Sequence, residues 1–525
     1  MAWNTATASN YRDVLTKLVQ AATSKYISAV AINSGGSSYT AGDILTITHA
    51  GATIDAKIEV LTVSSGVITS AVIRSAGAFS NRVATVAVNA GGTGYAAGDI
   101  VALDEAEGVW TQRAKITVST VSAGVVTAVA VLEGGAYSTA PSLTGVATEG
   151  VGPAAFAGND DLTVDVTMSG LIGSSGISAS GGTGSGATFD LTLTDVGMTA
   201  LRDRHDYSYN SVTDEKEVVL EGTNTGSDKP YLGFRSFSEP DGVSTRYHVL
   251  LTMMTSHNAG LSFDSQSNIL QSTPHATAQV SIPCLNSSMS MWISATERRI
   301  SGCVKTVGGS TTAYQTFFTG LLNPFGTVTE NPWPAIVAAS CPSMDYAPDD
   351  ATGGHISGIT EAYWISGVTA PIRMFQTSTM TWVSIRNFNG STQSFTRVVY
   401  PVGEPTAIVD TTDPNMIVDE GPVIFTNGIV DPSAGTATQT LKPAPDSGGD
   451  KFALIPATVI RTPSGDLANT DIHGEMDGVF FVSATKADGS TIASEDTITE
   501  NGVRYRVFAN GPRTNRYSYL AMLEA

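Results

Sequence analysis

The chain has 525 residues and a formal net charge of −20, with 42% hydrophobic but only 14% charged residues. This hydrophobic content is sufficient for folded cores, and no G-X-Y period is present, so the composition argues against a disordered or a collagen-like chain. Because no Lys/Arg cluster is longer than Arg298-Arg299, the chain lacks the basic face that nucleic-acid binding needs.

Residues 1–25 are predicted to form a short amphipathic helix that serves as a docking segment. Its apolar side chains recur at helical spacing, and they are Val14, Leu15, Leu18, Val19 and Ala22. Asn10 or Ser9 is suited to cap the helix. The apolar stripe must be buried, either against the rest of this chain or, as the alternative, on a neighbouring subunit. The segment has no signal-peptide pattern, and no apolar run in the chain is long enough for membrane insertion.

Residues 26–198 are predicted to contain two or three glycine-rich β repeats. The segment from Ser34 to Ile44 recurs from Ala90 to Ile100 at an offset of 56 residues, and a second matching pair lies at an offset of 58. Each unit has a Gly-Gly turn, a tyrosine, an Ala-Gly-Asp turn and an alternating strand, as expected for small antiparallel modules. A degenerate third copy is predicted across 145–195.

Residues 199–400 are predicted to form a larger β-sandwich-like domain of short strands separated by turn clusters. The Pro-, Thr- and Asp-rich segment 401–449 is interpreted as a linker or extended arm, and 450–525 as a C-terminal β section. The fold class is therefore all-β: tandem small modules, a larger sandwich-like domain and a C-terminal section, with one short N-terminal helix.

No established catalytic motif is present. The sequence lacks G-x-S-x-G, G-x-x-x-x-G-K-[ST] and H-E-x-x-H, and its seven histidines never pair at metal-ligand spacing. The three cysteines, Cys284, Cys303 and Cys341, form no CxxC and are interpreted as buried free thiols. We therefore expect no enzyme, no catalytic residue, no cofactor and no resident metal.

Loop carboxylates are the only candidate cation ligands. They occur around Pro348, in 410–420 and in 446–450. Solvated turn residues are the simpler interpretation, because Asp favours turns for backbone reasons. Calcium binding by these loops stays open, since Asp410-Thr-Thr-Asp-Pro-Asn415 offers oxygen ligands but departs from the EF-hand pattern.

Aromatic side chains provide the one candidate ligand site. Trp333, Trp364 and Trp382 are predicted to stack on glycan rings from a surface groove of the 199–400 domain. Trp292, Tyr314 and Tyr363 belong to the same aromatic set. The competing interpretation is that these residues fill the core of the sandwich, where strand aromatics more often lie.

Several segments resemble a group of tailed-bacteriophage virion proteins. They are Tyr231–Phe237, Met291–Lys305, Tyr314–Gly326 with Trp333-Pro334, Asp477–Phe481, Thr497–Arg506 and Tyr517–Leu523. The glycine-rich repeats are also similar to modules of phage tail and fibre proteins. The resemblance covers about two-thirds of the chain and is weakest at 340–450. It implies a protein made in the bacterial host cytoplasm and located in the virion as a homo-oligomer, either trimer or hexamer, because phage tails have such symmetry.

These observations together predict a structural, tail-associated virion component of a baseplate, collar or fibre attachment. Its expected partners are copies of itself and other virion proteins, and it is expected to act by assembly. The first alternative is a receptor-binding tail protein that grips host surface glycan, and the second is a capsid decoration protein. Neither nucleic acid nor membrane is an expected partner.

Overall fold

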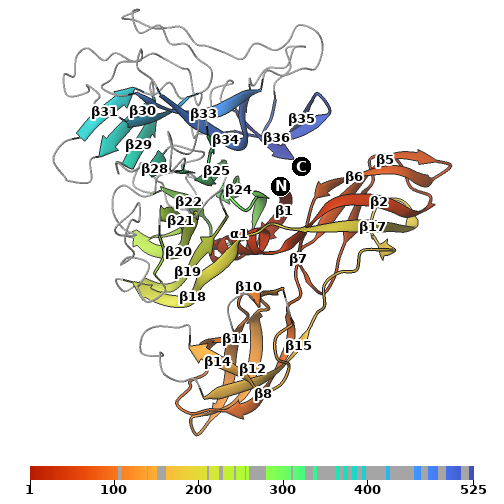
Figure 1. The fold of residues 1–525 in the computed structure, drawn as a ribbon, viewed down its shortest axis with the longest axis vertical. Coiled ribbons are helices and arrows are strands. Elements are labelled where there is room, and N and C mark those ends of the chain that lie inside the picture. Colours follow the sequence, from red (N-terminus) through yellow and green to blue (C-terminus); the bar gives the residue numbers. More distant parts are fainter. Residues whose placement is uncertain are drawn as a thin grey trace, which may run out of the picture.

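The structure is a computed structural model. It describes residues 1–104, 109–138, 140–150, 161–209, 212–223, 229–241, 244–254, 256–258, 280–308, 311–324, 335–339, 361–365, 371–376, 381–386, 393–397, 421–425, 454–462, 471–482, 492–509 and 519–524. Strands dominate these residues, and a single helix is found among them, which confirms the all-β prediction (Figure 1). None of the described segments is a helix with the length and hydropathy needed to cross a membrane.

A central body contains two antiparallel sheets. The first has nine strands in the order β1 (Ala2–Ala8), β23 (Met289–Ala295), β24 (Arg299–Gly308), β25 (Thr311–Leu321), β27 (Ala335–Ala339), β28 (Glu361–Ile365), β29 (Pro371–Gln376), β30 (Thr381–Arg386) and β31 (Gln393–Arg397). The second has the order β18 (Thr199–Tyr209), β19 (Val212–Glu221), β20 (Tyr231–Asp241), β21 (Ser244–Met254) and β22 (Val280–Cys284). Side chains of both sheets share one apolar core, as the sandwich-like prediction requires.

The predicted helix is α1, Tyr11–Thr23, and it lies in this core. All five apolar residues of the predicted stripe are fully buried, against strands that include β1, β20, β21 and β23. Asn10 is the cap: its side chain accepts hydrogen bonds from the backbone N–H groups of Arg12 and Asp13 at 3.0 and 3.1 Å. Intramolecular packing of the stripe is thereby confirmed. Ahead of the helix lies a strand that the sequence analysis missed, β1, which pairs with β23.

Module 1 consists of two small sheets around one core. The five-stranded sheet has the order β16 (Ile177–Ser178), β17 (Ser185–Asp195), β2 (Lys25–Ser37), β7 (Ala78–Phe79) and β4 (Ala52–Ile54). The three-stranded sheet has the order β3 (Ile44–Ile47), β5 (Ala56–Ser64) and β6 (Val67–Ser75). Alternation along the strands directs side chains such as Leu45, Ile58 and Phe189 into the shared core.

Module 2 repeats this plan and is inserted within module 1. Its six-stranded sheet has the order β12 (Val125–Glu133), β11 (Lys115–Ser122), β9 (Ile100–Leu103), β14 (Val146–Gly150), β15 (Leu162–Met168) and β8 (Val83–Gly91), beside the pair β10 (Trp110–Gln112) and β13 (Ala136–Tyr137). The chain enters and leaves module 2 at adjacent points, because Ser169 N–H donates to the Arg82 carbonyl at 2.8 Å.

Of the two or three predicted repeats, the described strands form two modules. Residues 145–195 form no separate module but supply the strands that complete the other two: β14 and β15 complete module 2, and β17 returns to pair with β2 of module 1. The returning strand of each module is held by the same kind of hydrogen bond to a tyrosine. Tyr39 accepts a hydrogen bond from Ala187 N–H at 3.4 Å, and Tyr95 accepts one from Leu162 N–H at 3.3 Å.

The C-terminal sheet contains β32 (Gly421–Phe425), β33 (Ile455–Thr462), β34 (Asp471–Val482), β37 (Tyr519–Glu524), β36 (Val503–Ala509) and β35 (Thr497–Glu500), with β26 (Asn323–Pro324) paired to β34. Within 401–449, which was interpreted as a linker or extended arm, Gly421–Phe425 form a strand that pairs with β33. Buried Arg299 of β24 contacts Asp477 of β34 at 2.8 Å and links this sheet to the central body.

The Ala-Gly-Asp turn of the modules recurs unexpectedly before β35. At Thr40–Asp43, Ala96–Asp99 and Ala493–Asp496, the final aspartate accepts a hydrogen bond from the first residue's N–H. In each turn the carbonyl of that aspartate also accepts from a strand valine, at 2.8–3.0 Å. The third position has a positive φ in all three turns: 93° at Gly42, 97° at Gly98 and 74° at Glu495.

Candidate functional site

The tryptophan site stays a prediction, because no side chain of Trp333, Trp364 or Trp382 is described. Trp333 lies outside the described residues. Trp364 lies on β28 and Trp382 on β30, which are separated by β29, and only their backbone is described. Trp292 is only 7% exposed, and its ring packs against Phe508 with centroids 5.0 Å apart, as the core interpretation predicts.

The cysteines and the acidic loops are the remaining candidates from the sequence, and they are either buried or outside the described residues. Cys284 and Cys303 are buried free thiols, as predicted, and burial raises the pKa of both, so they are poor nucleophiles. Cys341 and the acidic loops at 410–420 and 446–450 lie outside the described residues. Within the described part of the chain, no group of three or more His, Cys, Asp or Glu side chains is arranged to hold a metal ion.

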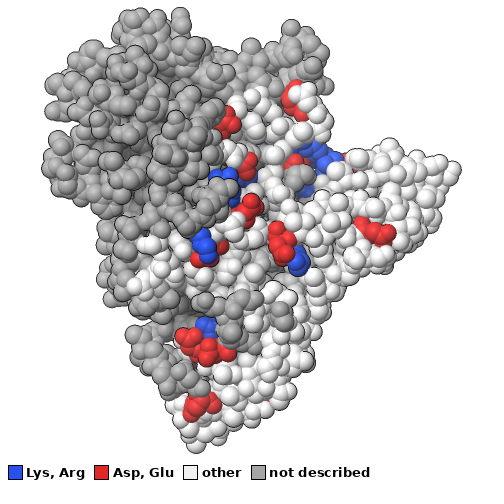
Figure 2. All heavy atoms as spheres, in the orientation of Figure 1, with Lys and Arg blue, Asp and Glu red and all other residues white. Residues whose placement is uncertain are grey.

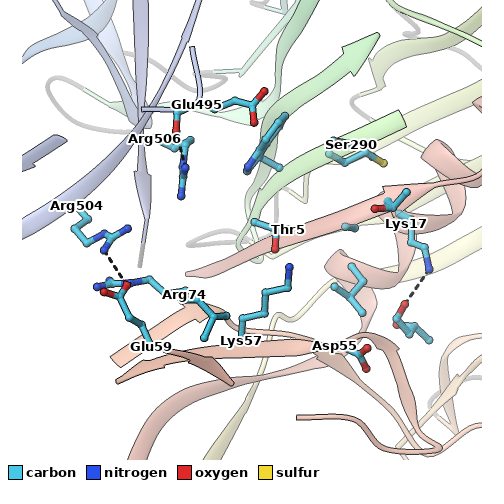
Figure 3. Close-up of a pocket in the computed structure, with 17 residues that line it drawn as sticks. Thr5, Lys17, Asp55, Lys57, Glu59, Arg74, Ser290, Glu495, Arg504 and Arg506 are labelled. Carbon is cyan, nitrogen blue, oxygen red and sulfur yellow. Dashed lines mark hydrogen bonds and ion pairs between the residues drawn. The ribbon is translucent and has the colours of Figure 1, made fainter. Parts of the chain in front are cut away.

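A cavity of about 580 Å³ lies where module 1 meets the central body and the C-terminal sheet. Its walls come from β1, α1, β3 to β6, β23 and the β35–β36 region, so four distant parts of the sequence meet there. We call it the junction cavity. Figure 3 shows its side chains: those of module 1 lie on one side, those of the C-terminal sheet lie on another, and β1 runs between them.

Charged groups dominate the walls of the junction cavity. Five of the 28 Lys and Arg residues of this acidic chain line it, together with three carboxylates. The cations are Lys17, Lys57, Arg74, Arg504 and Arg506, and the acids are Asp55, Glu59 and Glu495. The cavity therefore carries an excess of positive charge in a chain whose net charge is −20.

Three of these cations share two carboxylates. Glu59 contacts Arg74 at 2.5 Å and Arg504 at 3.3 Å, which links module 1 to β36. Glu524 contacts Arg504 at 3.1 Å and Arg506 at 2.7 Å. Such a chain of ion pairs fixes the guanidinium groups in place, and it leaves them with a net positive charge because each carboxylate serves two of them.

Glu495 holds a strained position at the edge of the same cavity. Its φ of 74° lies in the left-handed region, where the equivalent residues of the two modules are glycines. Its carboxylate contacts Lys305 Nζ at 2.5 Å and accepts from Tyr314 Oη at 2.9 Å, while its carbonyl accepts from Arg506 Nη1 at 2.6 Å. The strained turn thus helps to orient Arg506 toward the cavity.

Lys57 is the least constrained cation of the cavity. It is exposed on β5, and no hydrogen bond or ion pair to another described residue involves its side chain. In Figure 3 its ammonium points away from the module 1 sheet toward β1, where Thr5 lies. Hydroxyl groups complete the wall, from Thr5, Thr7, Thr53 and Ser290. The Oγ1 atom of Thr5 has no hydrogen-bond partner among the described residues.

A second charged cluster joins module 2 to the central body, and we call it the Glu133 clamp. Glu133 of β12 contacts Lys115 Nζ of β11 at 3.0 Å and also contacts Lys216 Nζ of β19. Lys216 donates in addition to Thr16 of α1 at 2.9 Å. The three charged side chains are at most 7% exposed. Burial lowers the pKa of nearby Arg82, and the charge of Glu133 opposes that shift.

The visible faces of the two modules carry few charged side chains. Figure 2 shows large white areas on both modules, with a few acidic groups on each and one basic group beside the acidic ones on module 2. Exposed apolar side chains on the module surfaces include Leu61 and Val67 in module 1 and Val125 and Leu132 in module 2. Hydroxyl pairs such as Thr62 with Thr69 and Thr120 with Thr127 accompany them at 2.7 and 2.8 Å.

The sequence analysis did not identify the junction cavity, although a local signal was present. Lys57 and Glu59 alternate on one strand, and so do Arg504 and Arg506 on another, which places each pair on one face of its strand. Comparisons with known proteins add no assignment: no protein-family model matches the chain, and no curated protein is significantly similar to it.

Proposed function

We propose that this chain is a structural component of a bacteriophage virion, associated with the tail, that acts by assembling with copies of itself and with other virion proteins. The resemblance of its sequence segments to tailed-phage virion proteins suggests this role. We propose no catalytic activity for it.

One structural observation carries the proposal: two β modules are attached to a large β body through ion pairs, which are buried at module 2 and partly exposed at module 1. The modules project from the body in Figure 1, and the Glu133 clamp holds module 2 through side chains that are nearly fully buried. The face of the modules that Figure 2 shows has few charges, and exposed Leu61, Val67, Val125 and Leu132 lie on the module surfaces. Such a surface can be covered by another subunit at a low desolvation cost, because few charged groups must be removed from water.

The first experiment is localisation on intact phage particles. A gold label attached through a flexible linker after Ala525 should appear on the tail in electron micrographs, and light scattering of the purified chain should give a trimer or hexamer. A label over the head would favour the decoration alternative and contradict a tail location. Absence of the chain from purified particles would contradict the virion role.

A second candidate function, receptor binding, is favoured by the junction cavity rather than by the predicted tryptophans. Cations and hydroxyl groups converge there on a space of ligand size. Label at the tip of the tail or on its fibres would support this candidate over a baseplate or collar component.

A further inference from the structure

The junction cavity lies where three parts of the protein meet, but it is lined by more charged side chains than the contacts between those parts use. Arg74, Glu59 and Arg504 already connect module 1 to β36. Lys57 takes no part in that connection: its side chain has no partner among the described residues, although it lines the same space. An exposed lysine directed into a cavity that already has several arginines increases the repulsion between cations. The position of Lys57 is therefore better explained by binding of an anionic ligand than by a contribution to the stability of the fold.

The size and shape of the cavity also suit a ligand. Its volume of about 580 Å³ falls within the range of about 300–1,000 Å³ that is typical of small-molecule sites. Its walls belong to strands of four sheets and to α1, and the ion pairs of Glu59 and Glu524 fix the arginines. Cations held in this way are preorganised, so binding an anion requires little further ordering of side chains.

The hydroxyl groups narrow the class of ligand. Thr5, Thr7 and Ser290 each carry a hydroxyl that can donate and accept hydrogen bonds, whereas the hydroxyl of Thr53 already donates to the Ala78 carbonyl at 3.3 Å and is left as an acceptor. Sugar hydroxyls have the same dual character, whereas carboxylate, sulfate or phosphate substituents pair with guanidinium and ammonium groups. Asp55, Glu59 and Glu495 lie among the cations and would repel an anion that filled the whole space. A ligand that is mostly neutral and polar, with anionic groups at intervals, fits these walls best.

We propose that the junction cavity binds an acidic saccharide, with the anionic substituents held by Lys57, Arg74, Arg504 and Arg506. This inference does not depend on the proposed virion role. Localisation on the particle and saccharide binding are independent measurements, so the failure of one leaves the other standing.

The test is calorimetric titration of the full chain at low ionic strength with four probes. They are trigalacturonate as the acidic saccharide, maltotriose as a neutral saccharide, inorganic sulfate as an anion without a sugar, and an acidic peptide of matching charge. Trigalacturonate should bind more tightly than the other three. If sulfate or the peptide binds as tightly as trigalacturonate or more tightly, the ligand is a simple anion or an acidic peptide and not a saccharide. Absence of trigalacturonate binding would overturn the proposal.

Two variants locate the site. Lys57→Ala should weaken trigalacturonate binding about fivefold or more, since it removes a cation without breaking a protein contact. Lys229→Ala is the matched control: it removes the same charge from an exposed pair with Glu221 on the central body and should leave binding unchanged. Equal effects of the two variants would exclude the junction cavity.

Glu59→Gln changes the affinity in the opposite direction. It keeps the size of the side chain and removes the negative charge between Arg74 and Arg504, so binding of the anion should tighten. Thermal unfolding of each variant shows whether the fold is intact. If Glu59→Gln loosens the junction, Lys57→Ala still decides the proposal, because the Lys57 side chain makes no hydrogen bond or ion pair with another described residue.

Discussion

Removal of the Glu133 carboxylate should detach module 2 from the central body before the module itself unfolds. Glu133 contacts both Lys115 and Lys216, which are 0% and 1% exposed. In Glu133→Ala these two ammonium groups lose that carboxylate while they are still held out of water. The rest of module 2 keeps its own core, which includes Val101, Ile116 and Val164.

The expected magnitude follows from this burial. Removal of one partner from a buried ion pair costs about 3–5 kcal/mol, because the remaining charge is left uncompensated. At about 1.4 kcal/mol for each factor of ten, a loss of about 3 kcal/mol makes opening of the module 2 joint at least a hundredfold more frequent. Glu149→Ala is the matched control on the same module, because Glu149 is 52% exposed and pairs with Arg113 at the surface. Its cost should stay below about 1 kcal/mol.

Hydrogen exchange followed by mass spectrometry is the appropriate assay, since a chain with several cores need not unfold in two states. Glu133→Ala should accelerate exchange in β10, in β13 and in α1, which border the joint, while exchange in β11 and β15 changes less. If Glu133→Ala accelerates exchange in these segments no more than Glu149→Ala does, the clamp does not hold module 2 and the reasoning fails.

Three further predictions concern the turns and the insertion. Hydrogen bonds from Thr40 and then Thr183 lower the pKa of Asp43 to about 2. Its contribution to the stability of module 1 is therefore complete above about pH 4 and is lost as the pH falls toward 2. Asp43→Asn should abolish that part of the acid dependence of unfolding, and a pH profile unchanged by this variant would refute the prediction. Glu495→Gly should be about 1 kcal/mol more stable than Glu495→Ala in thermal unfolding, because both lose the same contacts and only glycine favours the positive φ; equal stabilities would contradict the strain. Deletion of residues 83–168 should leave a chain that circular dichroism shows to be folded, because residues 82 and 169 are already adjacent. Lys216→Met accompanies the deletion, since Lys216 loses its partner Glu133. Aggregation or loss of the strand signal would contradict the view that module 2 is an independent insertion.

Local patterns predicted the elements that depend on local physics. The apolar stripe of α1 and its Asn10 cap follow from helical periodicity and from the unpaired N–H groups of a first turn. Ser65-Gly66 and Ala123-Gly124 form the equivalent hairpin turns of the two modules, and all four residues have positive φ. The alternating strands of the modules were predicted for the same reason, whereas β24 of the central body is buried on both faces along most of its length and shows no such alternation.

The nesting of the modules could not be predicted, because the choice of a strand's partner is not local. The glycine-rich segment at 180–186 resembles the start of a repeat, yet it closes module 1 against a strand about 150 residues earlier. A physical reason for the resemblance is visible in the fold. A Cβ on Gly36 would lie 2.4 Å from the Ser185 carbonyl, and one on Gly184 would lie 2.4 Å from the Ser37 carbonyl, so both sides of the closure need small residues.

The candidate site depended on tertiary structure even more strongly. Trp364 and Trp382 were chosen for their type alone, whereas Lys57, Glu59 and Arg504 derive their significance from two sheets that meet in space. Alternating charges on a strand indicate an outward face, but nothing in either segment shows that the two faces would be opposite each other.

The distribution of charge indicates what fixes the modules and the C-terminal sheet in their orientation on the central body. Charged side chains are few on the module faces that Figure 2 shows, yet they are concentrated at the joints: the Glu133 clamp, the junction cavity and the buried pair of Arg299 with Asp477. An apolar joint would bury as much surface without desolvating ions, but apolar contacts tolerate sliding and rotation more readily than paired charges do. Fixed ion pairs define one orientation for each part. Under the proposed assembly role, such a defined orientation would hold the two modules at set positions toward neighbouring subunits.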